Sequence, residues 1–158
     1  MSPMKLYLMR HGQSPGMLEA GVKRDFDRPL SERGRRDARE AAAYLNEHGI
    51  IPELVLASPL LRAQQTAQEV TTALSRPTPL KSYEPLSNQI SGSELFIELG
   101  KETGLPGSVM LIGHLPQLPE LTHHLTGVDI SIAPAGLLAL DVAEKGSKLL
   151  WTRVPDGV

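Results

Sequence analysis

The stretch Leu6-Tyr7-Leu8-Met9-Arg10-His11-Gly12-Gln13-Ser14 joins a short apolar run to a cationic and polar tip. The apolar part, within residues 5–9, predicts a buried β-strand. A strand needs no arginine, histidine and glycine at its end. A cation, a titratable imidazole and a glycine that permits a backbone bend together indicate the floor of a site. The alternative is that Arg10 and His11 only cap the strand at the surface, and the rest of the chain has to decide between the two.

The composition narrows the class of protein. A chain of 158 residues suits one domain, over residues 1–158, with a single sizeable core. The formal net charge of -2 disfavours a nucleic-acid binder, which usually carries a basic excess. The absence of cysteine excludes thiol nucleophiles, disulfides and cysteine-ligated metals.

Hydropathy gives no sign of a membrane segment. No apolar run in the sequence approaches the roughly 20 residues that span a bilayer. The apolar run before Arg10 is also too short for a signal peptide. We therefore expect a monomer in the cytoplasm, with no membrane and no nucleic acid as partner.

Apolar periodicity predicts strands that alternate with helices. The expected strands cover about 5–9, 54–57, 78–81, 109–112, 135–142 and 148–154, and the expected helices about 31–48, 58–74, 93–103 and 116–126. Ser31 and Ser58 are expected to cap helices, while 15–29 and 83–92 are expected to be irregular. This order predicts an α/β three-layer sandwich, with a mainly parallel sheet, helices on both faces and an antiparallel edge from the closing hairpin.

Three strand ends carry unusual residues. The first strand ends at Arg10 and His11, the second leads through Ser58 to Arg62, and the fourth ends at His114. Because the carboxyl ends of parallel strands meet at one edge of a sheet, these side chains should lie close together.

Arg62 is the most informative of these residues. It falls in the first turn of a helix, where the macrodipole favours an anion, so a cation there suggests a shared anionic ligand. The simpler readings are a solvated arginine for Arg62 and a structural turn histidine for His114. The other histidines occupy helix ends or polar faces, and we expect no role for His48 or for the adjacent pair His123 and His124, which do not share a helical face.

Two arginines and two histidines describe a pocket for a dianion. Arginine binds phosphate oxygens through a planar fork of donors, and neutral imidazole is a nucleophile toward phosphorus. The sequence has no Walker motif and no aspartate cluster for magnesium. We expect no cofactor and no metal requirement.

Four segments together resemble the histidine phosphatase superfamily, which has the phosphoglycerate mutase-like fold. The segments are 8–12 (Leu-Met-Arg-His-Gly), 28–34 (Arg-Pro-Leu-Ser-Glu-Arg-Gly), 58–67 (Ser-Pro-Leu-Leu-Arg-Ala-Gln-Gln-Thr-Ala) and 112–116 (Ile-Gly-His-Leu-Pro). The resemblance covers essentially the whole chain. It implies that His11 is the catalytic nucleophile and that Arg10, Arg62 and His114 surround the phosphate.

The chain has almost no room for the long insertions that cap the site in mutases and many sugar phosphatases of this superfamily. It is similar to the compact branch that includes bacterial protein phosphohistidine phosphatases. The resemblance implies a metal-independent phosphatase that forms a phosphohistidine intermediate and acts on phosphohistidine in a signalling protein. A phosphatase of small phosphorylated metabolites and a non-catalytic phosphoprotein-binding module are the alternatives.

Three further residues are weaker candidates. Many superfamily members place a catalytic acid after the third strand, and Glu84 is the nearest candidate here; the alternative is a loop carboxylate before a proline. The mixed-charge loop over 23–28 is the expected rim for a protein substrate, with Ser14 and Arg28 as candidate rim residues.

Overall fold

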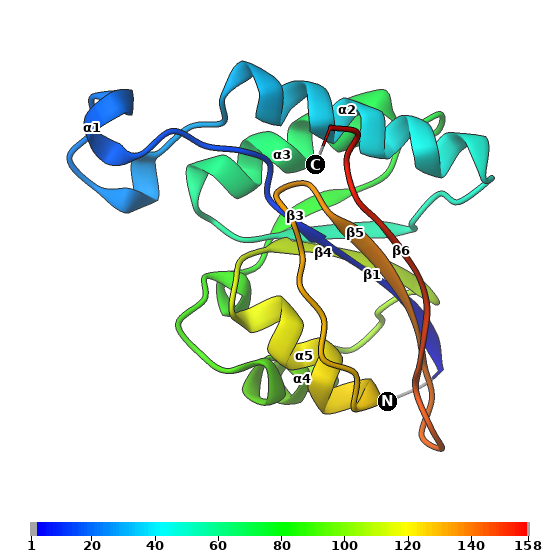
Figure 1. Ribbon diagram of the computed structural model, residues 1–158. Coiled ribbons are helices and arrows are strands. Elements are labelled where there is room, and N and C mark those ends of the chain that lie inside the picture. The colour runs from blue at the N-terminus through cyan, green and yellow to red at the C-terminus, as the bar shows by residue number, and fades with distance from the viewer. Residues whose placement is uncertain (1–2, 158) are drawn as a thin grey trace.

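The computed structural model describes residues 3–157, so residues 1, 2 and 158 of the expected domain lie outside the described residues (Figure 1). It contains a six-stranded sheet in the order β3-β2-β4-β1-β5-β6. The elements are β1 (Met4–Arg10), α1 (Met17–Ala20), η1 (Asp25–Asp27), α2 (Glu32–Glu47), β2 (Leu54–Ala57), α3 (Leu61–Ala73), β3 (Leu80–Ser82), η2 (Glu84–Leu86), α4 (Gly92–Lys101), β4 (Ser108–Gly113), α5 (Gln117–Thr126), β5 (Leu137–Val142) and β6 (Lys148–Arg153).

The pairing of the strands confirms the expected mixed sheet. β1 to β4 run parallel to one another, and β5 and β6 add an antiparallel edge beside β1. β1 and β4 are in register from Lys5 opposite Ser108 to Arg10 opposite Gly113. The two strands therefore end side by side, which brings the residues after them to the same place.

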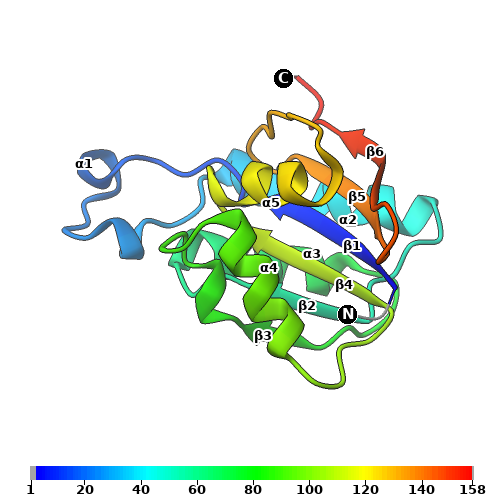
Figure 2. The ribbon, with the colours of Figure 1, turned by 90° about the horizontal axis from the view of Figure 1, so that it is seen from below.

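Helices cover both faces of the sheet, as expected for a three-layer sandwich. α2 and α3 lie on one face and α4 and α5 on the other (Figures 1 and 2). Successive strand residues point to opposite faces, so Met9 and Ile112 pack toward α2 and α3, while Leu8 and Leu111 pack toward α4 and α5. Burial on both faces explains why these strands are continuously apolar.

Local sequence accounts for the boundaries of α2. The Ser31 hydroxyl accepts a hydrogen bond from the Gly34 N–H, which is the predicted N-cap. Gly49 follows the helix with a φ of +67°, a conformation that favours glycine. The expected apolar face is fully buried, namely Ala38, Ala41, Ala42 and Leu45.

The structure corrects three local expectations. The segment 15–29, which we call the arm, contains the short helices α1 and η1 and extends away from the sheet (Figures 1 and 2). The segment 83–92 likewise contains η2. Ser58 does not cap α3, because that helix begins at Leu61 and its N-cap residue is Leu60. The Ser58 side chain has a different partner, described below.

Within residues 3–157 no helix is both long enough and apolar enough to cross a membrane.

Candidate active site

The tips of β1 and β4 bring two histidines together. The His11 N–H donates to the Gly113 carbonyl at 3.0 Å, which extends the pairing of the two strands by one residue. The centroids of the His11 and His114 rings lie 5.1 Å apart. Arg62 reaches the same place from the first turn of α3, so the expected convergence of the three junctions is present in the structure.

Gly12 is required here by a close approach and not by the expected backbone bend. It does not have a positive φ. A Cβ at this position would lie 2.7 Å from the Gly34 carbonyl oxygen, at the start of α2. The Gly12 N–H donates to the Thr66 hydroxyl at 3.0 Å, and that hydroxyl donates to the Arg62 carbonyl at 2.7 Å. The tip of β1 is thereby fixed to both α2 and α3.

The hydrogen bonds of His11 define its tautomer. Its Nδ1 lies 2.7 Å from the Gly12 carbonyl oxygen, which can only accept a hydrogen bond. Nδ1 therefore carries the proton and Nε2 carries the lone pair. Burial, and then the charges of Arg62, Arg10 and Arg28, lower the pKa of His11 to about 4, although the bond to Gly12 acts in the opposite direction. His11 is thus a neutral imidazole with a nucleophilic Nε2 at neutral pH.

Arg62 is a buried cation and not a solvated surface arginine. Its Nε donates toward His11 Nε2 at 3.4 Å, a long contact. Its Nη1 donates to the Asp25 carbonyl at 2.8 Å, and its Nη2 to the Asp25 carboxylate at 2.9 Å. Arg10 donates through Nη1 to the Ile132 carbonyl at 3.0 Å. The Arg10 Nε is buried and has no hydrogen-bond partner in the described part of the chain.

His114 is held by Ser58. Its Nε2 lies 2.7 Å from the Ser58 Oγ, which also accepts from the Leu60 N–H. Ser58 is fully buried, and among its partners within residues 3–157 only His114 Nε2 can take the hydroxyl proton. Nδ1 of His114 then carries the ring proton, and it is buried without a partner. Burial, and then the charges of His11 and Arg62, lower the pKa of His114 to about 3, so the ring is neutral.

These side chains leave several donors without acceptors around one nucleophile. The Arg10 Nε, the His114 Nδ1 and the remaining N–H groups of Arg62 suit the oxygens of a phosphoryl group. A buried donor without a partner costs free energy, so an anionic ligand is the natural acceptor. Among residues 3–157 there is no group of three or more histidine, aspartate or glutamate side chains that could hold a metal ion.

A cavity of about 260 Å³ opens beside this cluster. Its lining residues come from the arm, from α3 and the residue before it, from the segment after η2 and from the end of β4, and they are Asp25, Phe26, Leu60, Arg62, Ser87, Asn88, Gln89 and His114. Asn88 joins two of these walls, because its side-chain amide donates to the Leu115 carbonyl at 2.7 Å. The cavity provides space for the group that carries the phosphate.

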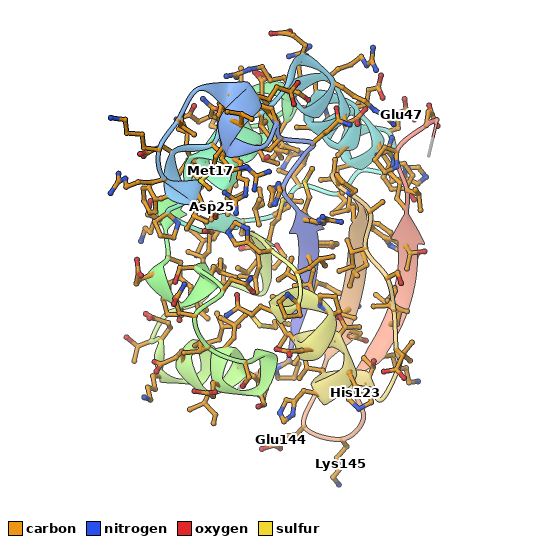
Figure 3. The ribbon with its side chains drawn as sticks, turned by 60° about the vertical axis from the view of Figure 1, so that its left-hand side comes forward. Met17, Asp25, Glu47, His123, Glu144 and Lys145 are labelled. Carbon is orange, nitrogen blue, oxygen red and sulfur yellow. The ribbon has the colours of Figure 1, made fainter. Side chains whose placement is uncertain are left out.

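Glu84 does not line this cavity. It is exposed at the start of η2, and Ser87, Asn88 and Gln89 line the cavity instead, so the role of Glu84 as an acid stays a prediction. The other histidines also lie elsewhere. His123 pairs with Asp129 at 2.8 Å, far from the arm (Figure 3). His48 bonds the Tyr44 carbonyl, and the ring of His124 lies against Phe96.

The two candidate rim residues brace the base of the arm. Arg28 donates to the Pro15 carbonyl at 2.8 Å and to the Ser14 carbonyl at 3.3 Å, and its Nη1 pairs with Asp25 at 2.9 Å. The Ser14 hydroxyl donates to the Pro29 carbonyl at 2.6 Å. Both side chains are partly buried, so their contact with a substrate stays a prediction.

Asp25 is the residue at the site that the sequence analysis missed. The spacing of Asp25 and Arg28 suggests a local ion pair, which is present. No local pattern in the sequence shows that the arm folds back onto α3. The structure shows it through the contact between Asp25 and Arg62.

Comparison with known proteins agrees with this geometry. A model of the histidine phosphatase superfamily (branch 1) matches residues 6–89. An uncharacterised protein of Picosynechococcus is 32% identical over 142 residues, covering 87% of this chain and 84% of that protein. The phosphohistidine phosphatase SixA of Escherichia coli is 32% identical over 124 residues, covering 77% and 74%.

Solved structures give the same result over more of the chain. A putative phosphohistidine phosphatase SixA from Agrobacterium tumefaciens superposes with a TM-score of 0.83 at 26% identity, covering 98% of this chain and all of that one. A protein histidine phosphatase SixA complexed with tungstate also gives 0.83, at 25% identity, covering 96% and 97%.

The fold places His11 and His114 at the tips of β1 and β4 and Arg62 beside them on α3, an arrangement suited to a phosphoryl group. The chain belongs to the histidine phosphatase superfamily (branch 1), because that family's model matches more than half of its length. It is therefore an enzyme, which sets aside the binding-only alternative.

Proposed function

We propose that this protein is a metal-independent phosphatase that removes phosphate from phosphohistidine on a signalling protein. The observation that carries the proposal is the Nε2 lone pair of neutral His11, with Arg62 Nε 3.4 Å away, the His114 ring 5.1 Å away, and buried donors without partners on Arg10 and His114. The similarity to SixA proteins supports the phosphohistidine substrate.

In the first step, the Nε2 lone pair of His11 attacks phosphorus and the bond to the leaving group breaks. The Nδ1–H bond to the Gly12 carbonyl stabilises the positive charge that develops on the His11 ring. Arg10, Arg62 and His114 stabilise the charge spread over the equatorial oxygens. In the second step, water attacks phosphorus, and inorganic phosphate and neutral His11 are released.

The absence of a suitable acid determines the preferred leaving group. An alkyl ester expels an alkoxide and needs a positioned acid to protonate it. Glu84 lies outside the cavity, and Asp25 is the carboxyl group in its lining. Arg28, and also Arg62, hold the pKa of Asp25 below its usual range. Asp25 is therefore ionised at neutral pH and has no proton to donate to a leaving group. Phosphohistidine instead expels an imidazole, whose conjugate acid has a pKa of roughly 6.5.

The test compares kcat/KM for a phosphohistidine protein, an aryl phosphate and a sugar phosphate. We expect the phosphohistidine protein to be the best substrate and the sugar phosphate the poorest. If the sugar phosphate is the best substrate and Glu84→Gln removes that advantage, Glu84 is a general acid and the protein is a small-molecule phosphatase.

The proposal also includes activity without a metal ion. Exhaustive chelation should leave turnover intact, and recovery of lost activity only on adding magnesium or zinc would contradict the proposal. Action as a monomer, in the cytoplasm and in signal transduction stays a prediction.

A further inference from the structure

Asp25 places a negative charge where a phosphatase has to bind a dianion. Its Oδ2 lies 2.9 Å from Arg62 Nη2, and its Oδ1 lies 2.9 Å from Arg28 Nη1. The side chain is 54% exposed and lines the cavity beside His114. Figure 3 shows Asp25 on the arm, at the same end of the molecule as the tip of β1. Such a charge opposes phosphate binding, so a compensating role in the reaction would explain its position.

The rest of the cavity lining indicates which leaving group fits. Phe26 and Leu60 provide apolar surfaces, while Ser87, Asn88 and Gln89 are uncharged polar residues. Arg62 is the one cation in the lining from the described chain, and it faces His11, where the phosphoryl group is transferred. The space for the leaving group therefore contains a carboxylate and neutral groups, which suits a flat ring that carries an N–H.

We propose that Asp25 is a further catalytic residue, which accepts a hydrogen bond from the substrate's imidazole ring at the nitrogen that does not carry phosphorus. This rests on the proposed function, since it requires phosphohistidine as the substrate. The carboxylate keeps that nitrogen protonated, and the protonated ring is the better leaving group. Asp25 would then select phosphohistidine over phosphate esters.

The step balances without any further reactant. The substrate binds with a proton from water on the ring nitrogen that faces Asp25. His11 Nε2 forms a bond to phosphorus, and the P–N bond of the substrate breaks. The electron pair of that bond goes to the ring nitrogen that carried phosphorus. The substrate histidine leaves as a neutral imidazole that keeps its N–H toward Asp25.

The surroundings of Asp25 keep it in the form that this step needs. Arg28 and Arg62 face the carboxylate and hold its pKa below the usual range, while the neighbouring residues after η2 are uncharged. Asp25 is therefore ionised at neutral pH and accepts a hydrogen bond. An ester oxygen has no N–H to offer it.

Asp25→Asn tests this role, with Asp27→Asn as the matched control. The amide keeps an oxygen that can accept from Arg62 but removes the charge. Asp27 lies two residues away and pairs only with exposed Arg24 in the described chain. For each variant, kcat/KM is measured with phosphoimidazole and with 4-nitrophenyl phosphate, whose leaving group needs no proton. Since a hydrogen bond to a charged group contributes about 1.5–3 kcal/mol, the ratio of the two values should fall roughly 10-fold or more in Asp25→Asn.

The outcomes separate this inference from the proposed function. Asp27→Asn should keep the ratio of the wild type. If Asp25→Asn lowers both activities in the same proportion, or neither, Asp25 only positions Arg62 or has no role, and the inference is wrong. A wild type that hydrolyses 4-nitrophenyl phosphate but not phosphoimidazole or a phosphohistidine protein overturns the proposed function as well.

A pH profile provides a second readout that a purely structural role would not change. With phosphoimidazole, kcat should fall as the bound ring loses its proton at high pH. Asp25 raises the pKa of that bound ring, so the fall should move about one pH unit lower in Asp25→Asn. An unchanged profile would contradict a hydrogen bond between Asp25 and the ring.

Discussion

His11 holds its proton on Nδ1 because the Gly12 carbonyl accepts it, and burial among arginines disfavours a second proton. We predict that the ring titrates near pH 4 in the free enzyme, below the usual value of about 6.5. The neutral nucleophile is then present throughout the physiological range and is lost only as the pH falls through about 4. NMR of labelled histidine rings measures the midpoint directly. A midpoint at or above 6.5 would show that the ring is not desolvated as the structure indicates.

The same geometry predicts which atom takes the phosphoryl group. Enzyme that is mixed with labelled substrate and quenched should carry an acid-labile, alkali-stable adduct on His11. His11→Ala should lose both the adduct and turnover, because the Nε2 of the neighbouring His114 accepts from Ser58 and cannot replace the His11 Nε2. His123→Ala is the control, since that ring pairs with Asp129 elsewhere. Normal turnover by His11→Ala would exclude the covalent mechanism.

Arg62 should be needed for its shape as well as for its charge. Its Nη1 and Nη2 are held by Asp25, and its Nε points toward His11. By analogy with the loss of one oxyanion donor, Arg62→Ala should lower kcat by roughly 10²–10³. Arg62→Lys should also be poor, because an ammonium group cannot replace the planar fork. Steady-state kinetics decides this, and a loss of less than about threefold in Arg62→Ala would remove Arg62 from the proposed site.

Sequence reasoning identified the candidate site residues at the strand ends. It missed the side chains that hydrogen-bond to them. Arg10, His11, Arg62 and His114 follow from junctions of strands and from family-like segments. Asp25 depends on how the arm folds back onto α3, which no local pattern encodes. Ser58 matched the pattern of a helix cap, but its hydroxyl pairs with His114, which is 56 residues away. The sequence alone therefore did not reveal contacts between single polar side chains that are far apart in the chain.

At the scale of elements, the start of α2 has to approach the loop after β1 closely. A Cβ on Gly34 would lie 2.2 Å from the Gln13 carbonyl oxygen, which is backbone and cannot move aside alone. Gly34→Ala should therefore be destabilising, by about 1–3 kcal/mol, even though alanine is the better helix former. It should also lower kcat, because Gln13 follows the His11-Gly12 segment.

Gly100→Ala is the matched control for that substitution. Gly100 lies within α4, and a Cβ there would have no neighbour within 4 Å. This change should stabilise the protein by roughly 0.5–1 kcal/mol through helix propensity alone. Thermal or urea unfolding measures both variants. Equal effects of the two substitutions would show that the approach at Gly34 is not tight.

The order of elements was predictable because the apolar periodicities are strong. The buried alanine face of α2 and the apolar runs of β1, β2 and β4 leave little choice of secondary structure. The short helices of the arm were not predictable, because α1 and η1 contain no buried residue whose spacing could indicate a helix. The arm is held instead by polar contacts of Arg28, Ser14 and Asp25.

At the scale of the whole molecule, the parallel order β2-β4-β1 places two strand tips side by side, with α3 beside them. A position at the centre of the sheet places both histidines between the helical layers, with His114 buried and His11 half-buried. Burial keeps both rings neutral at neutral pH, because it disfavours their charged forms. The arrangement that suits catalysis therefore makes the folded state sensitive to acid.

This coupling predicts how stability depends on pH. His11 and His114 have pKa values lowered to about 4 and about 3 in the folded state, while unfolded histidine titrates near 6.5. Between those values the unfolded chain binds more protons, so the free energy of unfolding should rise with pH from about 4 to about 6.5 and level off above that. Thermal unfolding at pH 5 and pH 7 measures the difference. His114→Asn should reduce the difference, because it removes one of the two buried rings whose pKa is lowered on folding. A wild type that is equally stable at both values would mean that the paired histidines are charged in the folded protein.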